Sequence, residues 1–202
     1  GAVPVFCDSL LSTWQMDPED VKKKITPKTK AIMAVHLYGH PCDMDAFSSM
    51  CKEHDIFLIE DCAEAIGSKY KGKIVGTFGD ISTFSFFGNK TITTGEGGMV
   101  VTNDETLIER ARHFKGQGLA QHREYWHDVI GSNFRMTNIE AAIGLAQLEK
   151  VEIFIAQKQE IAKKYQEAFK SGPVEFHQSH LDVFHTYWMC SILVPEANDR
   201  EK

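Results

Sequence analysis

The chain has 202 residues and a formal net charge of −6, from 22 basic and 28 acidic side chains. That length predicts one domain, or one domain and part of another. The acidic balance argues against nucleic-acid binding, and the densest basic cluster, Lys22–Lys24, belongs to a short helix with an acidic start. No apolar run approaches the roughly 18 residues of a membrane-spanning segment. We therefore expect a globular protein with neither nucleic acid nor membrane as a partner.

Cysteine and histidine spacing indicates neither disulfides nor a metal site. The five cysteines are scattered without Cys-x-x-Cys pairs, which is typical of reduced cysteines in a cytoplasmic protein. His36 and His40 have helical spacing, but Gly39 and Pro41 rule out a helix that presents both to zinc. We expect no metal and a cytoplasmic location.

Strand and helix patterns alternate along the first 115 residues. Residues 1–8 run directly into a first strand, and short β-branched or aromatic runs predict the strands that follow. The later strands cover 30–37, 56–60, 79–86 and 98–102, and the predicted helices cover 18–25, 42–55 and 105–115. Such alternation predicts an α/β fold, with a mostly parallel sheet and helices on both faces.

One long helical pattern, with room for a kink near Val151, covers 137–170. The polar, glycine-bounded segment 116–131 precedes it and is long enough to be a functional loop. Gly172 and Pro173 end the helix, and 187–194 begins a strand whose partners would lie beyond Lys202. We therefore expect a large domain over 1–170 and the start of a smaller α/β domain over 171–202.

Two of the predicted strands end in residues that can carry chemistry. The apolar run 56–59 ends in Glu60 and Asp61, and the run 81–87 ends in a turn that contains Lys90. In open α/β sheets, ligand-binding groups collect at strand ends. Asp61 and Lys90 can therefore share one crevice.

A lysine amine and a carboxylate are the two groups that pyridoxal phosphate requires of a protein. The amine forms a Schiff base with the cofactor, and the carboxylate pairs with its ring nitrogen. Glycines at 95, 97 and 98 allow a close backbone approach beside the lysine turn. The spacing alone leaves two interpretations open, a cofactor lysine and an ordinary surface lysine.

Three separated segments resemble the DegT-type sugar-nucleotide aminotransferases, which are fold type I pyridoxal-phosphate enzymes. They are DCAEAIG at 61–67, FSFFGNKTITTGEGGMV at 84–100 and SNFRMTNIEAAIGLAQLE at 132–149. VHLYGHPCDMDA at 35–46 supports the resemblance, although the family usually has a smaller or amide residue where His40 stands. Compared with the family, the chain begins inside the large domain, so we expect an N-terminal portion to be missing and apolar surface to be exposed.

The resemblance implies a role for each cofactor residue. Lys90 is similar to the Schiff-base lysine, which also moves a proton during the reaction. Asp61 is similar to the partner of the ring nitrogen, with a helix N-cap as the alternative. Glu64 stands where the family has Gln or Glu near the phenolic oxygen, with a solvated helix residue as the alternative. Ser85 matches a phosphate-binding serine, or is an ordinary serine at a strand end.

The remaining candidates concern the subunit interface and the substrates. In the resembled family, the residue at Asn133 reaches the cofactor phosphate of the neighbouring subunit, which implies a homodimer with a shared active site. Arg135 could face the donor carboxylate or the sugar-nucleotide phosphates, or form a structural ion pair. His185 is a substrate candidate, with a surface histidine as the alternative.

The implied activity is transfer of an amino group from an amino acid, expected to be glutamate, to a nucleotide-linked 4-keto-6-deoxy sugar. A sugar 3-dehydratase of the same family is one alternative, although those enzymes have histidine in place of the Schiff-base lysine. A non-catalytic or regulatory homologue is another. The sequence does not specify the sugar, the nucleotide or the amino donor.

Overall fold

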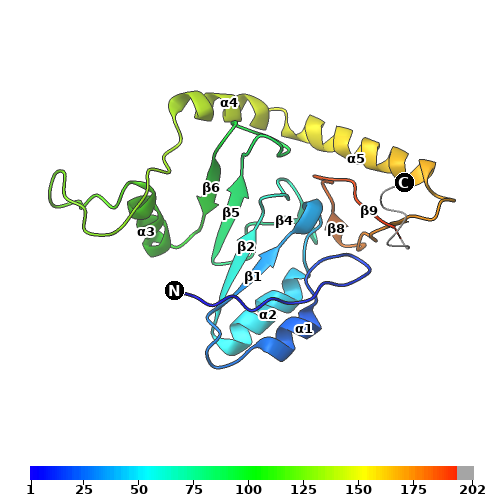
Figure 1. Cartoon of the computed structure of the whole chain (residues 1–202), viewed down its shortest axis with the longest axis horizontal. Coiled ribbons are helices and arrows are strands. Elements are labelled where there is room, and N and C mark those ends of the chain that lie inside the picture. Colours follow the sequence, from blue (N-terminus) through cyan, green and yellow to red (C-terminus); the bar gives the residue numbers. More distant parts are fainter. Residues whose placement is uncertain (195–202) are drawn as a thin grey trace.

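A computed structural model of the chain describes residues 1–194, and its centre is a four-stranded sheet in the order β1-β2-β5-β6 (Figure 1). The strands are β1 (Ala31–Val35), β2 (Phe57–Asp61), β5 (Ile81–Ser85) and β6 (Gly98–Val101). β1, β2 and β5 are parallel, and β6 runs antiparallel to β5. The α/β fold with a mostly parallel sheet is therefore confirmed.

The prediction of a strand at residues 1–8 is wrong. These residues hold no strand, and the side chains of Val3 and Phe6 are exposed. They have no neighbouring strand to supply backbone partners, and β-branched residues alone do not make a strand. The first regular element is helix α1 (Pro18–Lys24), which Asp17 caps by accepting the Glu19 N–H.

Helix α2 (Met44–His54) covers one face of the sheet. Its N-cap is Asp43, and its apolar side chains Met44 and Phe47 are fully buried. They pack with Leu58 and other residues that strand alternation places on the same face. Met33 and Phe57, which alternate to the other face, are 53% and 59% exposed. The covered face therefore holds the core, and the open face displays apolar side chains.

Two small sheets stand beside the main one. β3 (Lys69–Tyr70) lies between β4 (Lys73–Ile74) and β8 (Val183–Phe184), and β7 (Glu175–Phe176) pairs with β9 (Ile192–Leu193). The strand expected over 187–194 is thus limited to 192–193, and its partner lies inside the chain. Tyr187 has a left-handed backbone with φ of 49°, which ends any extended run there. The rest of the expected second domain, 195–202, lies outside the described residues.

The long helical pattern is divided into α4 (Asn138–Leu148) and α5 (Val151–Ala168). A capping box between Thr137 and Glu140 starts α4. The Lys150 N–H donates to Gln147 O three residues back, which tightens the last turn and ends the helix. Figure 1 shows α4 beyond the ends of β5 and β6, and Gln147 Oε1 accepts the Thr93 N–H at 2.9 Å. The expected kink is therefore a break, and α4 supports the turn after Lys90.

The other predicted helix, α3 (Glu105–Lys115), is confirmed, with Asp104 as its N-cap. A short 3-10 turn, η1 (Leu37–Gly39), follows β1. Among the described residues, no helix combines the length and the apolar character that crossing a membrane requires.

Candidate active site

Asp61 and Ser85 lie on the open face of the sheet, at the ends of neighbouring strands. Asp61 pairs in register with Thr83, and paired residues of adjacent strands point to the same face. Ser85 follows two residues later and therefore shares that face. Asp61 Oδ1 accepts the Ala63 N–H at 3.0 Å, and residues 62–68 form turns without a helix. The alternative of a helix N-cap is therefore wrong for Asp61.

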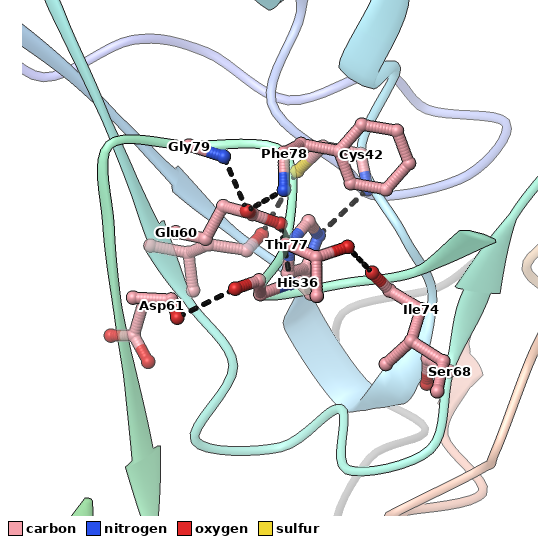
Figure 2. A network of polar contacts seen from close by, with 12 residues as sticks. His36, Cys42, Glu60, Asp61, Ser68, Ile74, Thr77, Phe78 and Gly79 are labelled. Atoms are coloured by element: carbon pink, nitrogen blue, oxygen red, sulfur yellow. Dashed lines mark hydrogen bonds and ion pairs between the residues drawn. The ribbon is translucent and has the colours of Figure 1, made fainter. Parts of the chain in front are cut away.

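The neighbouring carboxylate, Glu60, points into the core and is fully buried. It accepts the backbone N–H groups of Gly76, Phe78 and Gly79 at 2.6 to 2.7 Å (Figure 2). Burial raises the pKa of Glu60, but the hydrogen bonds outweigh burial and leave the pKa below its usual value. Figure 2 shows the Asp61 side chain turned away from this network. Glu60 is therefore a structural carboxylate.

His36 completes the Glu60 network. Its Nδ1 accepts the Cys42 N–H at 3.0 Å, so the proton of the neutral ring is on Nε2, which donates to Glu60 Oε2 at 3.2 Å. His36, Glu60 and Cys62 place possible ligand atoms within 4.8 Å of one another. The hydrogen bonds already occupy the imidazole and the carboxylate, and burial raises the pKa of the Cys62 thiol. This cluster is explained by folding and needs no metal.

Lys90 lies beside one carboxylate and one aromatic ring. Its side chain is 14% exposed, and its Nζ is 3.8 Å from Glu64 Oε1 and 4.0 Å from the centre of the Trp188 ring. The other Glu64 oxygen accepts the Tyr38 N–H at 2.7 Å. Glu64 is thus neither on a helix nor fully solvated. The structure brings Lys90 and Glu64 together, and it adds Tyr38 and Trp188.

Sequence reasoning missed Tyr38 and Trp188 because nothing in the sequence shows that they lie beside Glu64 and Lys90, although Tyr38 is part of the segment 35–46 that supports the resemblance. The Trp188 N–H donates to Tyr38 O at 2.9 Å, and its indole N–H donates to Asn89 O at 2.9 Å. Tyr38 has a left-handed backbone with φ of 58°, which is rare for a large side chain. A non-glycine residue with positive φ cannot be read from the sequence, and these contacts join segments that are far apart along the chain.

The side chain of His185 is buried among other rings. It is 4% exposed, and its Nε2 donates to Tyr38 O at 3.1 Å. Its ring stacks on Tyr187 and lies near the buried rings of His40 and His177. The alternative of a surface histidine is therefore wrong, and the structure places His185 as a support for Tyr38.

The three buried imidazoles are neutral at physiological pH. Burial lowers the pKa of His40 to about 4 and that of His185 to about 3, and it also lowers the pKa of His177. His177 Nδ1 and His185 Nδ1 have no hydrogen-bond partner within the described residues. The cluster is therefore less completely satisfied than the Glu60 network.

Asn133 and Arg135 lie on the surface, in the segment before α4. Both are exposed, and Asn133 Oδ1 accepts the Arg135 N–H at 3.4 Å. Within residues 1–194, Arg135 forms no ion pair, so the structural alternative finds no support. Their roles toward a partner subunit or substrate stay predictions.

The polar groups at the strand ends fit pyridoxal phosphate. Within the described residues, Lys90 Nζ donates no hydrogen bond, Asp61 has one carboxylate oxygen without a donor, and the Ser85 hydroxyl accepts a backbone N–H but donates to nothing. An amine, an acid and a hydroxyl that are not otherwise engaged match the aldehyde, the ring nitrogen and the phosphate of the cofactor.

A mostly parallel sheet followed by these groups is similar to the fold of solved aminotransferases. The chain belongs to the DegT/DnrJ/EryC1/StrS aminotransferase family, whose model matches residues 1–202. The resemblance seen in the sequence is thus confirmed, and aminotransferases of this family use pyridoxal phosphate.

Within the family, the chain is similar to two proteins named as GDP-perosamine synthases. The chain is 67% identical to GDP-perosamine synthase of Escherichia coli O157:H7 over 202 residues, which is all of this chain and 55% of that protein. It is 51% identical to GDP-perosamine synthase of Vibrio cholerae over 97% of this chain and 53% of that protein. The S. venezuelae DesV crystal structure matches with a TM-score of 0.90 at 30% identity, over 98% of this chain and 54% of that chain. The chain therefore spans about half the length of the relatives it matches.

Proposed function

We propose that the whole protein is a pyridoxal-phosphate-dependent aminotransferase that acts on a GDP-linked 4-keto-6-deoxy sugar, with an amino acid, expected to be glutamate, as the donor. The product would be a GDP-perosamine-type amino sugar for surface polysaccharide. The observation that supports this most is the position of Lys90, which lies beside Glu64 in the turn after β5. β5 ends at Ser85, and the neighbouring strand β2 ends at Asp61. The identity to two GDP-perosamine synthases supports the choice of sugar and nucleotide.

Each residue has a distinct task in this proposal. Bound pyridoxal phosphate supplies an electron sink for the carbon that loses a proton. Lys90 Nζ would remove the proton from the α carbon of the donor and later deliver a proton to the sugar. A positioned acid–base group of this kind contributes about 10²–10⁴-fold to the rate. Asp61 would keep the ring nitrogen protonated, and Ser85 would donate to the phosphate.

Glu64 would act through Lys90 and Tyr38. One carboxylate oxygen lies 3.8 Å from the Lys90 amine, and the other fixes the Tyr38 backbone. A carboxylate in this place would help to orient the amine toward the cofactor. Asn133 would bind the cofactor phosphate of the partner subunit. Arg135 would bind the donor carboxylate or the phosphates of the sugar nucleotide.

The assembly and the location follow from the same proposal. We expect a homodimer, because the residue at Asn133 reaches the cofactor phosphate of the neighbouring subunit in the resembled family, and Asn133 is exposed. All five cysteines are free, which agrees with a reducing cytoplasm. The division into domains over 1–170 and 171–202 stays a prediction.

Two other functions are weaker. A 3-dehydratase of this family would need histidine at the position of Lys90, and the residue there is lysine. A non-catalytic homologue would have no reason to keep the Lys90 amine, the Asp61 carboxylate and the Ser85 hydroxyl without mutual hydrogen bonds at neighbouring strand ends.

The test is covalent trapping at Lys90 combined with a product assay. Borohydride treatment of the loaded full-length protein, followed by proteolysis and mass spectrometry, should place the cofactor adduct on the peptide that contains Lys90. Lys90→Ala should lose the adduct and at least ~10²-fold of turnover on GDP-linked keto sugar. Lys73→Ala, a change at an exposed lysine, is the matched control.

An adduct on another lysine, or turnover of Lys90→Ala within tenfold of the original, would contradict the proposal. A panel of GDP-, UDP- and dTDP-linked keto sugars would test the nucleotide separately. Preference for a UDP or dTDP sugar would reject the perosamine-type product and keep the aminotransferase.

A further inference from the structure

The Lys90 amine has an aromatic neighbour that comes from the far end of the described chain. The centre of the Trp188 ring lies 4.0 Å from Lys90 Nζ, which is within the range of a cation–π contact. The nearest carboxylate oxygen, Glu64 Oε1, is 3.8 Å away, beyond ordinary hydrogen-bond length. The indole face is therefore a main determinant of where the ammonium sits.

Trp188 is itself held from several sides. Its backbone N–H and its indole N–H both donate at 2.9 Å, to Tyr38 O and Asn89 O, and the Lys158 ammonium from α5 donates to its carbonyl at 3.1 Å. The Tyr38 and Trp188 rings are stacked with 20° between their planes. A side chain fixed at so many points keeps one orientation, so it can impose a position on a flexible lysine.

Lys90, Glu64, Tyr38 and Trp188 contact one another in a ring. Glu64 joins the amine to the Tyr38 backbone, and Tyr38 joins Trp188, which returns to the amine. The Trp188 indole also binds the carbonyl of Asn89, the residue next to Lys90, so it fixes the backbone of the turn as well as the amine.

We propose that Trp188 is a positioning residue for Lys90, and that its indole face holds the amine at the strand end while the segment after α5 is docked. This rests on the proposed function only in that Lys90 is taken as the reacting amine. Trp188 follows closely after β8, which pairs with β3. The position of the Lys90 amine therefore depends on how the segment 183–188 packs.

The test compares variants at Trp188 that differ in the aromatic face. Trp188→Phe and Trp188→Met both remove the indole N–H, but only phenylalanine keeps a ring. In the cofactor-free full-length protein, we expect acetic anhydride to label Lys90 roughly five- to tenfold faster in the Met variant than in the Phe variant, because an ammonium held on a ring reacts slowly. Labelling of Lys73 is the internal reference.

Trp126→Leu is the matched control, because the Trp126 ring faces Arg123 at 4.3 Å and none of its contacts involves Lys90. It should leave the Lys90 labelling ratio unchanged. In the loaded protein, the Met variant should lower kcat more than it raises KM for the amino donor, and the Phe variant should recover most of the loss.

Equal Lys90 labelling in the Phe and Met variants, with Lys73 labelling constant, would overturn the proposal and leave Trp188 as a packing residue. If the Met variant unfolds, Lys73 labelling rises as well, and the Phe variant then decides: slow Lys90 labelling supports the proposal and fast labelling overturns it. A failed borohydride adduct at Lys90 would reject the proposed function without affecting this result.

Discussion

Glu60 and Asp61 are neighbours in the sequence but differ in almost every physical respect. The Glu60 side chain faces the core and has no exposed surface. Its carboxylate accepts hydrogen bonds from three backbone N–H groups and from His36. Asp61 faces the open side of the sheet, is half-buried and accepts one backbone N–H. Strand alternation separates the two carboxylates, so one stabilises the fold and the other stays free for chemistry.

The histidine beside Glu60 and the histidine beside Tyr38 also differ in how completely their ring nitrogens are hydrogen-bonded. His36 uses both ring nitrogens in the Glu60 network. His185, which supports Tyr38 on the Lys90 side, leaves Nδ1 without a partner among the described residues. Burial disfavours the charged form of His185, so protonation of this ring in acid costs the folded protein stability.

The largest effect is expected from Glu60→Ala. The change leaves the N–H groups of Gly76, Phe78 and Gly79 buried without an acceptor, so the free energy of unfolding should fall by about 3–5 kcal/mol. Urea denaturation measures this loss. Glu53→Ala, at an exposed position of α2, is the control and should stay within about 0.5 kcal/mol. A loss under 1 kcal/mol at Glu60 would remove the distinction between the two carboxylates.

Acid should destabilise the imidazole cluster before it affects Glu60. The pKa values of His40 and His185 are lowered from 6.5 to about 4 and about 3, so the unfolded chain binds protons first as the pH falls. The free energy of unfolding should be flat above pH 6.5 and fall by about 2–3 kcal/mol per imidazole between pH 6.5 and 4.5. The pKa of Glu60 is also lowered, so its own loss follows below 4.5.

His185→Phe sharpens this prediction, because the change keeps the stacking on Tyr187 and removes one titrating group. It should remove about 2 kcal/mol of the loss between pH 6.5 and 4.5 in urea titrations at each pH. His122→Gln, at an exposed loop position, should leave the pH profile unchanged. An unaltered profile in His185→Phe would show that the cluster does not control acid stability.

Asp61→Asn should separate function from folding. Asparagine keeps the oxygen that accepts the Ala63 N–H, so the free energy of unfolding should change by less than about 0.5 kcal/mol. Loss of the charge should lower turnover by about 10²-fold, which corresponds to ~2.7 kcal/mol in the barrier. Steady-state rates at saturating cofactor measure this effect. Turnover within threefold of the original would assign Asp61 a structural role.

The sequence by itself determined the family, the helices α1, α2 and α3, the four strands of the main sheet, and the positions of Asp61 and Ser85 at strand ends with Lys90 in the turn that follows. These features depend on local patterns, because hydrophobic periodicity and turn residues act over a few positions. The tertiary structure decided the rest: the Glu64, Tyr38 and Trp188 contacts around Lys90, the burial of His185, the break between α4 and α5, and the absence of a strand at residues 1–8. Those features depend on contacts between distant segments and on backbone conformations such as the positive φ of Tyr38, which no local pattern specifies.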